Sequence, residues 1–152
     1  MGGLAEKLTG AGVVGLDTSI FIYHLEANPT YATQTKTVFE NLEAGNFQAI
    51  TSAITLMELT VLPWRMGHEN IAREYEAVLV NFPNLSIVDI DRNVARLAAK
   101  LRADFKISPA DALQVAASLQ AGAKAFLTND KRLSNLQTVI EILILDDFVI
   151  AK

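Results

Sequence analysis

Short apolar runs alternate along the chain with longer segments in which apolar residues recur at helical spacing. The short runs are apolar on both sides, which is typical of strands buried within a parallel sheet. Strands are therefore expected at residues 13–16, 47–51, 85–90, 125–128 and 139–145. Helices are expected at residues 19–25, 31–44, 53–62, 68–81, 92–105 and 109–121, with a turn or short helix at 129–136. This alternation predicts an α/β fold around a mostly parallel sheet that is covered on both faces.

Residues with strong positional preferences mark the ends of several of these helices. Ser52, Asp91 and Ser108 stand where a side-chain oxygen can cap a helix N-terminus. Gly45 is typical of the position just past a helix C-terminus. Pro63 is expected to end the helix that precedes it, because proline cannot donate the next backbone hydrogen bond.

The composition is that of a folded globular protein. The chain has 152 residues, of which 51% are apolar and 20% charged. One domain is expected over residues 1–152, with the glycine-rich residues 1–11 as a loose lead-in. The chain contains no cysteine and only two histidines. This composition excludes disulfide frameworks, thiol nucleophiles and cysteine-ligated metal centres.

The charge balance is acidic, with 17 aspartates and glutamates, 13 lysines and arginines, and a net charge of −4. By itself this balance argues against non-specific coating of nucleic acid, which favours a basic protein. The first residues lack the basic and apolar regions of a signal peptide, and no apolar run approaches the roughly 20 residues that cross a membrane. A cytoplasmic protein with no membrane association is expected.

Four carboxylates stand where predicted strands end or the following helices begin. Asp17 directly follows the first strand, and Asp130 follows the fourth. Glu58 lies about two turns into the helix after the second strand, and Asp111 lies in the first turn of the helix at 109–121. Ligands of parallel sheets bind at the carboxyl ends of the strands, so we expect all four to converge at that edge.

Each carboxylate also has a purely structural interpretation. Asp17 and Asp130 suit helix N-caps or turns, and Asp111 suits a capping box with Ser108. Glu58 lies in a helix that is apolar nearly all round, so it is expected to be partly buried and to need a partner or a metal. Crowded like charges raise each other's pKa, and such a set is tolerated mainly where a cation neutralises it.

A ligand set made only of oxygens, without cysteine or histidine, favours a hard cation such as Mg²⁺ or Mn²⁺. One such ion, or two about 3.5–4 Å apart, would activate water and stabilise the leaving oxygen of a phosphodiester. The carboxylates therefore lead to the hypothesis of metal-assisted phosphodiester hydrolysis.

Several motifs occur in the order and spacing of a known family. The chain resembles a PIN domain over residues 13–149, in LDTSIFIYHLE, TSAITLMEL, SPADALQVAASLQAGAKAFLTNDKRL and the closing strand. The resemblance is closest to the VapC-like toxin ribonucleases of bacterial toxin–antitoxin pairs. It implies a three-layer α/β/α sandwich, an acidic Mg²⁺ or Mn²⁺ site and endonuclease cleavage of single-stranded RNA. An antitoxin protein and a second copy of the chain are the expected partners.

The resemblance implies a role for individual residues. The catalytic and metal-binding acids would be Asp17, Glu58, Asp111 and Asp130. Polar neighbours that would hydrogen-bond an acid or a metal-bound water are Thr18, Ser19, Thr128 and Asn129. Basic residues that would contact RNA phosphates are Lys131, Arg132, Arg65 and Lys106. No acid of the motif is missing, which argues for an active enzyme.

Apolar residues near these motifs are candidates for contacts with partners. Ile20, Phe21 and Leu25 are expected to face an antitoxin or a second subunit. Trp64 and Phe105 are candidates for stacking on RNA bases.

Two other functions stay open: a PIN nuclease of RNA processing that has no antitoxin, and a non-catalytic module that binds metal or RNA. A neighbouring antitoxin gene would favour the toxin, and a lack of Mn²⁺-dependent cleavage would favour the binding module. A phospho-acceptor receiver domain is disfavoured, because Leu16 rather than a second acid precedes Asp17.

Overall fold

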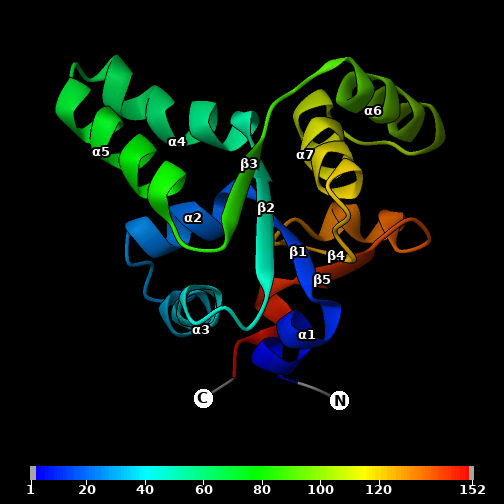
Figure 1. Ribbon diagram of the computed structural model, residues 1–152, viewed down its shortest axis with the longest axis horizontal. Coiled ribbons are helices and arrows are strands. Elements are labelled where there is room, and N and C mark those ends of the chain that lie inside the picture. Colours follow the sequence, from blue (N-terminus) through cyan, green and yellow to red (C-terminus); the bar gives the residue numbers. More distant parts are fainter. Residues whose placement is uncertain (1–2, 151–152) are drawn as a thin grey trace.

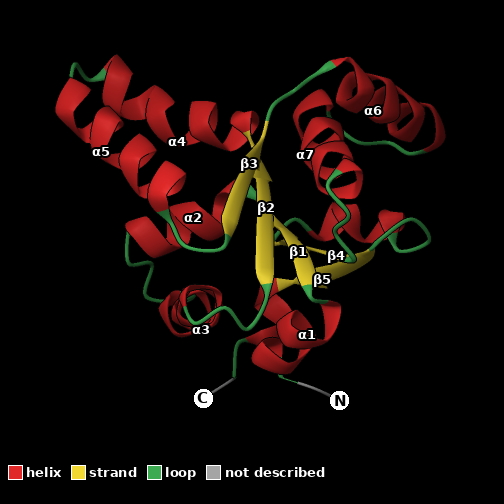
Figure 2. Cartoon of the chain, in the orientation of Figure 1, coloured by secondary structure: helices red, strands yellow, loops and turns green. Residues whose placement is uncertain are grey.

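The computed structural model describes residues 3–150, which form a five-stranded sheet with helices on both faces (Figures 1 and 2). Every neighbouring pair of strands is parallel, and the strand order is β3-β2-β1-β4-β5. The strands are β1 (Val13–Leu16), β2 (Gln48–Ser52), β3 (Leu85–Val88), β4 (Ala125–Thr128) and β5 (Glu141–Ile144). The predicted α/β class and parallel sheet are confirmed.

Apart from α1, which was not predicted, the helices follow the predicted order along the chain. They are α1 (Leu4–Ala11), α2 (Thr18–Leu25), α3 (Ala32–Glu43), α4 (Ala53–Arg65), α5 (Glu69–Asn81), α6 (Arg92–Asp104) and α7 (Pro109–Gln120). Short 3-10 helices follow β4 and β5: η1 (Lys131–Leu136) and η2 (Leu145–Phe148). The predicted caps Ser52, Asp91 and Ser108 are confirmed, since each side chain accepts a backbone N–H bond from its own helix.

Each face of the sheet has its own apolar cluster, because alternate strand residues point to opposite faces. Val14 and Leu16 of β1 pack toward α1, α2 and α3. Phe126 of β4 and Ile142 of β5 pack toward α6, α7 and η1. The pair α4 and α5 lies side by side near β3, and α6 and α7 lie side by side across the sheet (Figure 1). The arrangement is the three-layer sandwich that the resemblance implied.

Gly15 of β1 is the point where the strand and α7 approach most closely. A Cβ atom at this position would lie 2.7 Å from the Phe126 ring and closer still to the Ser118 hydroxyl, and both neighbours are buried. Gly15→Ala is therefore expected to lower the free energy of unfolding by about 1–3 kcal/mol through overpacking, as measured by urea denaturation. Gly10→Ala in α1 is the matched control, because a Cβ there meets nothing within 4 Å. An equal loss in both variants would contradict this explanation.

The N-terminal segment differs from the predicted loose lead-in. Leu4–Ala11 forms α1, while residues 1–2 lie outside the described part of the chain. Leu4 and Leu8, one turn apart, are buried in the cluster that includes β1 and α3. These two leucines are the only buried residues of the helix, and the residues around them are mostly small or polar. The sequence therefore shows too few apolar residues at helical spacing for the helix to be predicted.

Several element boundaries differ from the prediction: β3, for example, ends at Val88 rather than at residue 90. Two of the differences have a local explanation. The helix expected to end at Pro63 continues to Arg65. Proline removes only one hydrogen bond, to the carbonyl four residues earlier, and Pro63 stands in the last turn with its ring buried. The last strand is Glu141–Ile144 rather than residues 139–145, because the N–H groups of Val139 and Ile140 bond back to Leu136 in the preceding turn.

The helices are short compared with a bilayer. The longest, α4, α5 and α6, have 13 residues each. A membrane crossing takes a helix of about 20 apolar residues. Within residues 3–150, none of the helices has the length and apolar character for such a crossing.

Candidate active site

Asp17 lies at the carboxyl end of β1, the central strand of the sheet. It is the N-cap of α2, where its Oδ1 accepts the Thr18 N–H at 2.9 Å. Its Oδ2 accepts the hydroxyl of Thr128, at the end of β4, at 2.6 Å. The structural interpretation of Asp17 as a cap is therefore correct, and it is compatible with a functional role because each carboxylate oxygen has two lone pairs.

Thr128 joins the ends of two neighbouring strands. Its hydroxyl donates to Asp17 and also accepts the Asp130 N–H at 3.1 Å. The Asp17 N–H in turn donates to the carbonyl of Leu127 in β4 at 3.0 Å. The backbones of Asp17 and Asp130 are thereby held at adjacent strand ends.

Glu58 reaches this edge from α4, but it is exposed rather than partly buried as predicted. The Thr18 hydroxyl donates to Glu58 Oε1 at 2.6 Å, so Thr18 binds Glu58 with its side chain and Asp17 with its backbone. The burial prediction was wrong because part of the apolar surface of α4 is left uncovered by the described residues. Met57 and Leu62 beside Glu58 are each 56% exposed.

Asp111 enters the site from the first turn of α7. Its N–H donates to the Ser108 hydroxyl at 3.1 Å, but within residues 3–150 its carboxylate makes no return bond to Ser108. The predicted capping box is therefore half formed, and the Asp111 carboxylate is not used by it. The negative charge of Asp111 raises the pKa of Asp17, as does that of Glu58. The three carboxylates share one electrostatic environment.

Burial raises the pKa of Asp17 to about 6, and the nearby charges of Asp111 and Glu58 add to the rise. The hydrogen bonds from Thr128 and Thr18 act in the opposite direction. A carboxylate in this setting is stabilised at neutral pH by a proton or by a cation.

The raised pKa of Asp17 predicts a pH dependence of stability in the metal-free protein. The folded chain binds the proton below about pH 6, whereas the unfolded chain binds it only near the usual aspartate pKa of 3.8. Lowering the pH from about 7.5 to about 5 should therefore increase the contribution of Asp17 to the free energy of unfolding by about 1 kcal/mol. Urea denaturation in chelator measures this change. Asp17→Asn should remove this part of the pH dependence, and an unaltered dependence in the variant would contradict the assignment.

Asp130 forms an ion pair with Arg132. The Arg132 guanidinium binds it in a bidentate pair, with Nε at 3.0 Å from Oδ1 and Nη2 at 2.8 Å from Oδ2. Oδ1 also accepts the Arg132 N–H as the N-cap of η1. The hydrogen bond from Arg132 lowers the pKa of Asp130. The structure thus brings Asp17, Glu58 and Asp111 together and holds Asp130 in an ion pair beside them.

Within residues 3–150, no three acidic or histidine side chains are close enough together to form a metal-binding group. The chemistry of the donors nevertheless suits a hard cation, since all are carboxylate oxygens and Asp17 is destabilised as an anion by its neighbours. To hold such an ion, the carboxylates of Asp17, Glu58 and Asp111 would have to move closer together. Asp130 is held by its pair with Arg132, which would weaken if Asp130 joined them.

The two remaining polar neighbours predicted at the site have different surroundings. The Ser19 hydroxyl is buried and has no hydrogen-bond partner among the described residues. Asn129 instead contacts Tyr23 and Asp146: its Nδ2 donates to the Tyr23 hydroxyl at 3.2 Å, and its Oδ1 accepts the Asp146 N–H at 2.9 Å. In this position Asn129 connects the end of β4 to α2 and η2.

The four predicted RNA-contacting residues are all exposed. Lys131 forms an ion pair with Asp146 at 3.4 Å, and Arg132 forms the pair with Asp130. Arg65 lies in the last turn of α4. Lys106 lies in the loop between α6 and α7 and lines a cleft that also includes Asp111.

A buried hydrogen-bond network beneath the carboxylates was missed by the sequence analysis. Gln114 of α7 is only 2% exposed, and its Nε2 donates to the hydroxyls of Thr18 at 3.0 Å and Thr55 at 2.7 Å. Its Oε1 accepts the Ser52 hydroxyl at 2.6 Å. The signal was present in the sequence, because Gln114 follows Asp111 by one helical turn and stands in an otherwise apolar run.

Two clefts border the site. One, the basic cleft, has a volume of about 400 Å³ and lies between the loop after α6 and η1; its lining residues are Arg102, Phe105, Lys106, Ile107, Ser108, Asp111, Arg132 and Leu133. The other, the apolar groove, has a volume of about 270 Å³ and lies among α2, α4 and α5. Apolar residues dominate the lining of the groove, and Glu26 and Glu58 also line it.

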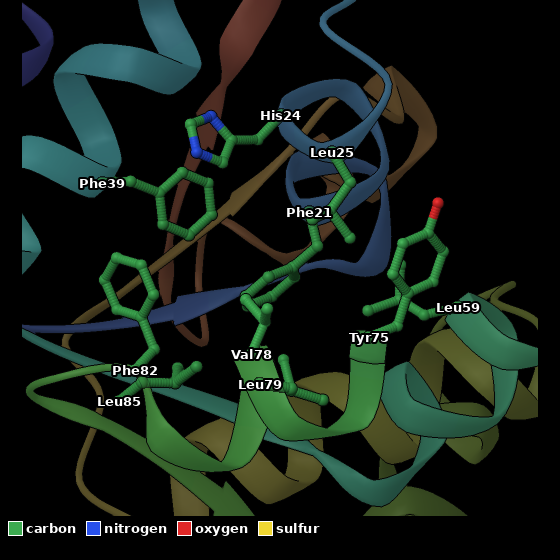
Figure 3. Close-up of a pocket in the computed structure, with 10 residues that line it drawn as sticks. All are labelled: Phe21, His24, Leu25, Phe39, Leu59, Tyr75, Val78, Leu79, Phe82 and Leu85. Atoms are coloured by element: carbon green, nitrogen blue, oxygen red, sulfur yellow. The ribbon is translucent and has the colours of Figure 1, made fainter. Parts of the chain in front are cut away.

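Next to the apolar groove, a small pocket of about 20 Å³ is surrounded by aromatic and aliphatic side chains (Figure 3). The ring centroids of His24 and Phe39 are 4.4 Å apart. The Tyr75 hydroxyl points away from the other labelled side chains. Leu25 lines both this pocket and the groove, so its predicted place at a partner-facing surface is consistent with the structure. Ile20 and Phe21, at 0% and 5% exposure, are core residues, and their predicted contact with a partner is wrong. They occupy the inner face of α2, while Leu25 lies at its end.

The family model for the PIN domain matches residues 14–138. The chain belongs to the PIN domain family. The matched segment runs from β1 through η1 and includes all four predicted carboxylates. A comparison with curated protein sequences gave no match.

Several solved structures have a fold similar to that of this chain. VapBC2 from Rickettsia felis, bound to promoter DNA, has a TM-score of 0.64 at 16% identity, covering 87% of this chain and 98% of that chain. A toxin–antitoxin complex from Klebsiella pneumoniae has a TM-score of 0.61 at 22% identity, with 87% and 97% covered. VapC20 from Mycobacterium tuberculosis, a toxin that cleaves the Sarcin-Ricin loop, has a TM-score of 0.63 at 17% identity, with 80% and 93% covered.

Proposed function

We propose that this PIN domain is a Mg²⁺- or Mn²⁺-dependent endoribonuclease that hydrolyses single-stranded RNA and acts as the toxin of a toxin–antitoxin pair. The observation that carries the proposal is the shared electrostatic environment of Asp17, Glu58 and Asp111 at the carboxyl end of the central strand. The likeness in fold to toxin–antitoxin structures, one of them a toxin that cleaves the Sarcin-Ricin loop, adds support.

In this proposal Asp17, Glu58 and Asp111 hold the cation, and Asp130 contributes when it is released from Arg132. When bound, the cation supplies Lewis-acid activation of water and neutralises charge on the phosphate oxygens. Thr18 and Thr128 keep Glu58 and Asp17 in fixed orientations through their short hydrogen bonds. Because Asp17 and Glu58 are held before RNA arrives, less reorganisation of these two side chains is needed for the reaction.

Positive charge near the acids would guide RNA to the site. Arg132 and Lys131 stand next to Asp130, and Lys106 lines the same cleft as Asp111. Release of Arg132 from Asp130 would make its guanidinium available to a phosphate, which binds the same planar fork as a carboxylate. Arg65 would contact RNA from the last turn of α4.

The direct test is incubation of the purified protein with defined single-stranded RNAs in Mg²⁺, in Mn²⁺ and in chelator. Cleavage in the presence of either metal and none in chelator is the expected result. Absence of cleavage under all three conditions would overturn the enzymatic proposal and leave a binding module.

We further propose that the apolar groove receives the antitoxin. Leu62, Met66 and Ile71 line it and are exposed by 56%, 60% and 39%, which is costly unless a partner covers them. Glu26 and Glu58 line the same groove. An amphipathic segment with apolar anchors and a lysine or arginine would therefore be complementary in both shape and charge.

A homodimer is proposed for the other exposed stripe of α4, which consists of Met57, Val61 and Trp64 at helical spacing. These side chains are 46–56% exposed and none is charged, which suits self-association about a two-fold axis. Sedimentation equilibrium should then give twice the chain mass of 16.5 kDa, and Val61→Glu should return the mass to that of one chain. A monomeric wild-type protein would contradict the proposal.

A further inference from the structure

The basic cleft reaches the acidic site at Asp111. Asp111 lines the cleft, and its charge also raises the pKa of Asp17. The cleft volume of about 400 Å³ is in the range that accommodates a small ligand such as one nucleotide. A ligand in the cleft would therefore lie directly beside Asp111.

Two cations of the cleft are not neutralised by acidic side chains. Arg132 is paired with Asp130, whereas Arg102 and Lys106 form no ion pair within residues 3–150. Arg102 Nε donates to the Ile107 carbonyl at 3.2 Å, which holds the guanidinium against the wall of the loop. A pre-oriented arginine with an adjacent lysine is a favourable site for the phosphate of a polyanion.

Phe105 adds a flat apolar surface to the same cleft. It follows the last residue of α6 in an extended conformation and is half-buried. Part of its side chain packs against the apolar cluster of α6 and α7, and it also lines the cleft. A ring anchored in this way can stack on a base at little cost in side-chain entropy.

The apolar groove on the other side of the site has the opposite character. Its lining includes Glu26 and Glu58 and no lysine or arginine. A polyanion entering there would be repelled, while an approach along the basic cleft would be attracted. The charges therefore assign one side of the site to RNA.

We propose that the basic cleft binds the nucleotide next to the cleaved phosphodiester, with Arg102 and Lys106 on its phosphate and Phe105 against its base. This inference rests on the proposed ribonuclease function, adds Arg102 to the surface that binds substrate, and places Phe105 and Lys106 in one subsite with it.

The test measures binding of a fluorescein-labelled single-stranded RNA of about 10 nucleotides, in chelator and at several salt concentrations. The double variant Arg102→Gln/Lys106→Gln is expected to bind at least about tenfold more weakly at low salt. The slope of log affinity against log salt should become shallower by about 1.4, because two phosphate contacts are lost. Lys100→Gln, an exposed lysine of α6 that does not line the cleft, is the matched control and should change neither quantity.

The role of Phe105 is tested separately, because stacking and charge leave different signatures. Phe105→Leu keeps an apolar side chain against the core and should weaken binding about tenfold with an unchanged salt slope. Phe105→Tyr retains the aromatic ring and should bind RNA with the wild-type affinity. Thermal denaturation of each variant shows whether the fold is kept, and Mn²⁺ titration shows whether the metal site is kept.

The outcomes separate this inference from the function on which it rests. If wild-type protein cleaves RNA in Mn²⁺ but the cleft variants bind as wild type does, the cleft assignment is overturned and the ribonuclease proposal stands. If the variants weaken binding but wild-type protein cleaves no RNA with any metal, the cleft assignment stands and the enzymatic proposal is overturned. If wild-type protein neither binds nor cleaves RNA, both are overturned.

Discussion

Asp17→Asn is expected to reduce metal-dependent RNA cleavage on the order of a thousandfold while making the metal-free fold more stable. The loss follows because Asp17 is the carboxylate held at the end of β1 by Thr18 and Thr128, and asparagine removes the charge that would bind the cation. The gain follows because the ionised carboxylate is disfavoured by burial and by Asp111 and Glu58. At neutral pH it should amount to about 1–2 kcal/mol.

The opposite signs of these two effects make the variant informative. Cleavage rates in Mn²⁺ and urea denaturation in chelator measure the two effects. Asp147→Asn, a change of the same chemistry at an exposed position in η2, should alter neither. Loss of activity together with loss of stability would indicate that Asp17 is mainly a structural cap, and wild-type cleavage by the variant would show that the site is elsewhere.

Gln114→Leu is expected to lower the free energy of unfolding by about 2–3 kcal/mol, even though leucine is similar in size and the site is buried. The amide of Gln114 bonds Thr18, Thr55 and Ser52, and their hydroxyls would lose buried partners. Because Thr18 also donates to Glu58, RNA cleavage should fall by about 10- to 100-fold through misplaced acids.

The matched control for Gln114→Leu is Gln120→Leu, at the exposed C-terminal end of the same helix. It should leave stability within about 0.5 kcal/mol of the wild-type value. If both glutamine variants are equally stable, the hydrogen-bond network of Gln114 does not stabilise the fold. A fall in stability with full activity would mean that Gln114 supports the fold but does not position the acids.

The sequence predicted most of the fold because its strands and caps are locally specified. The runs 13–16 and 125–128 are apolar on both sides and became β1 and β4 with the predicted bounds. Ser108 followed by proline marks the start of α7 in the same local way. Since a parallel sheet brings strand ends to one edge, the convergence of Asp17 and Asp111 also followed from pattern alone.

The features that could not be predicted depend on contacts between distant elements or on the choice of a side-chain rotamer. Glu58 looked buried because its helical neighbours are apolar, but a sequence does not reveal that α4 has an uncovered face. The pairing of Asp130 with Arg132 depends on which side-chain rotamers the two residues adopt, and the pattern of apolar and polar residues does not predict rotamers. Gln114 finds its partners on α2, α4 and β2, which lie at least 59 residues away along the chain.

The measurement that tests the central claim most directly is a parallel titration of Mn²⁺, recording metal binding by calorimetry and the rate of RNA cleavage at each concentration. Both curves should rise over the same Mn²⁺ range in the wild-type protein, and both should be lost in Asp17→Asn. Cleavage that persists in chelator, or Mn²⁺ binding that survives Asp17→Asn unchanged, would contradict a hydrolytic metal site built on Asp17, Glu58 and Asp111.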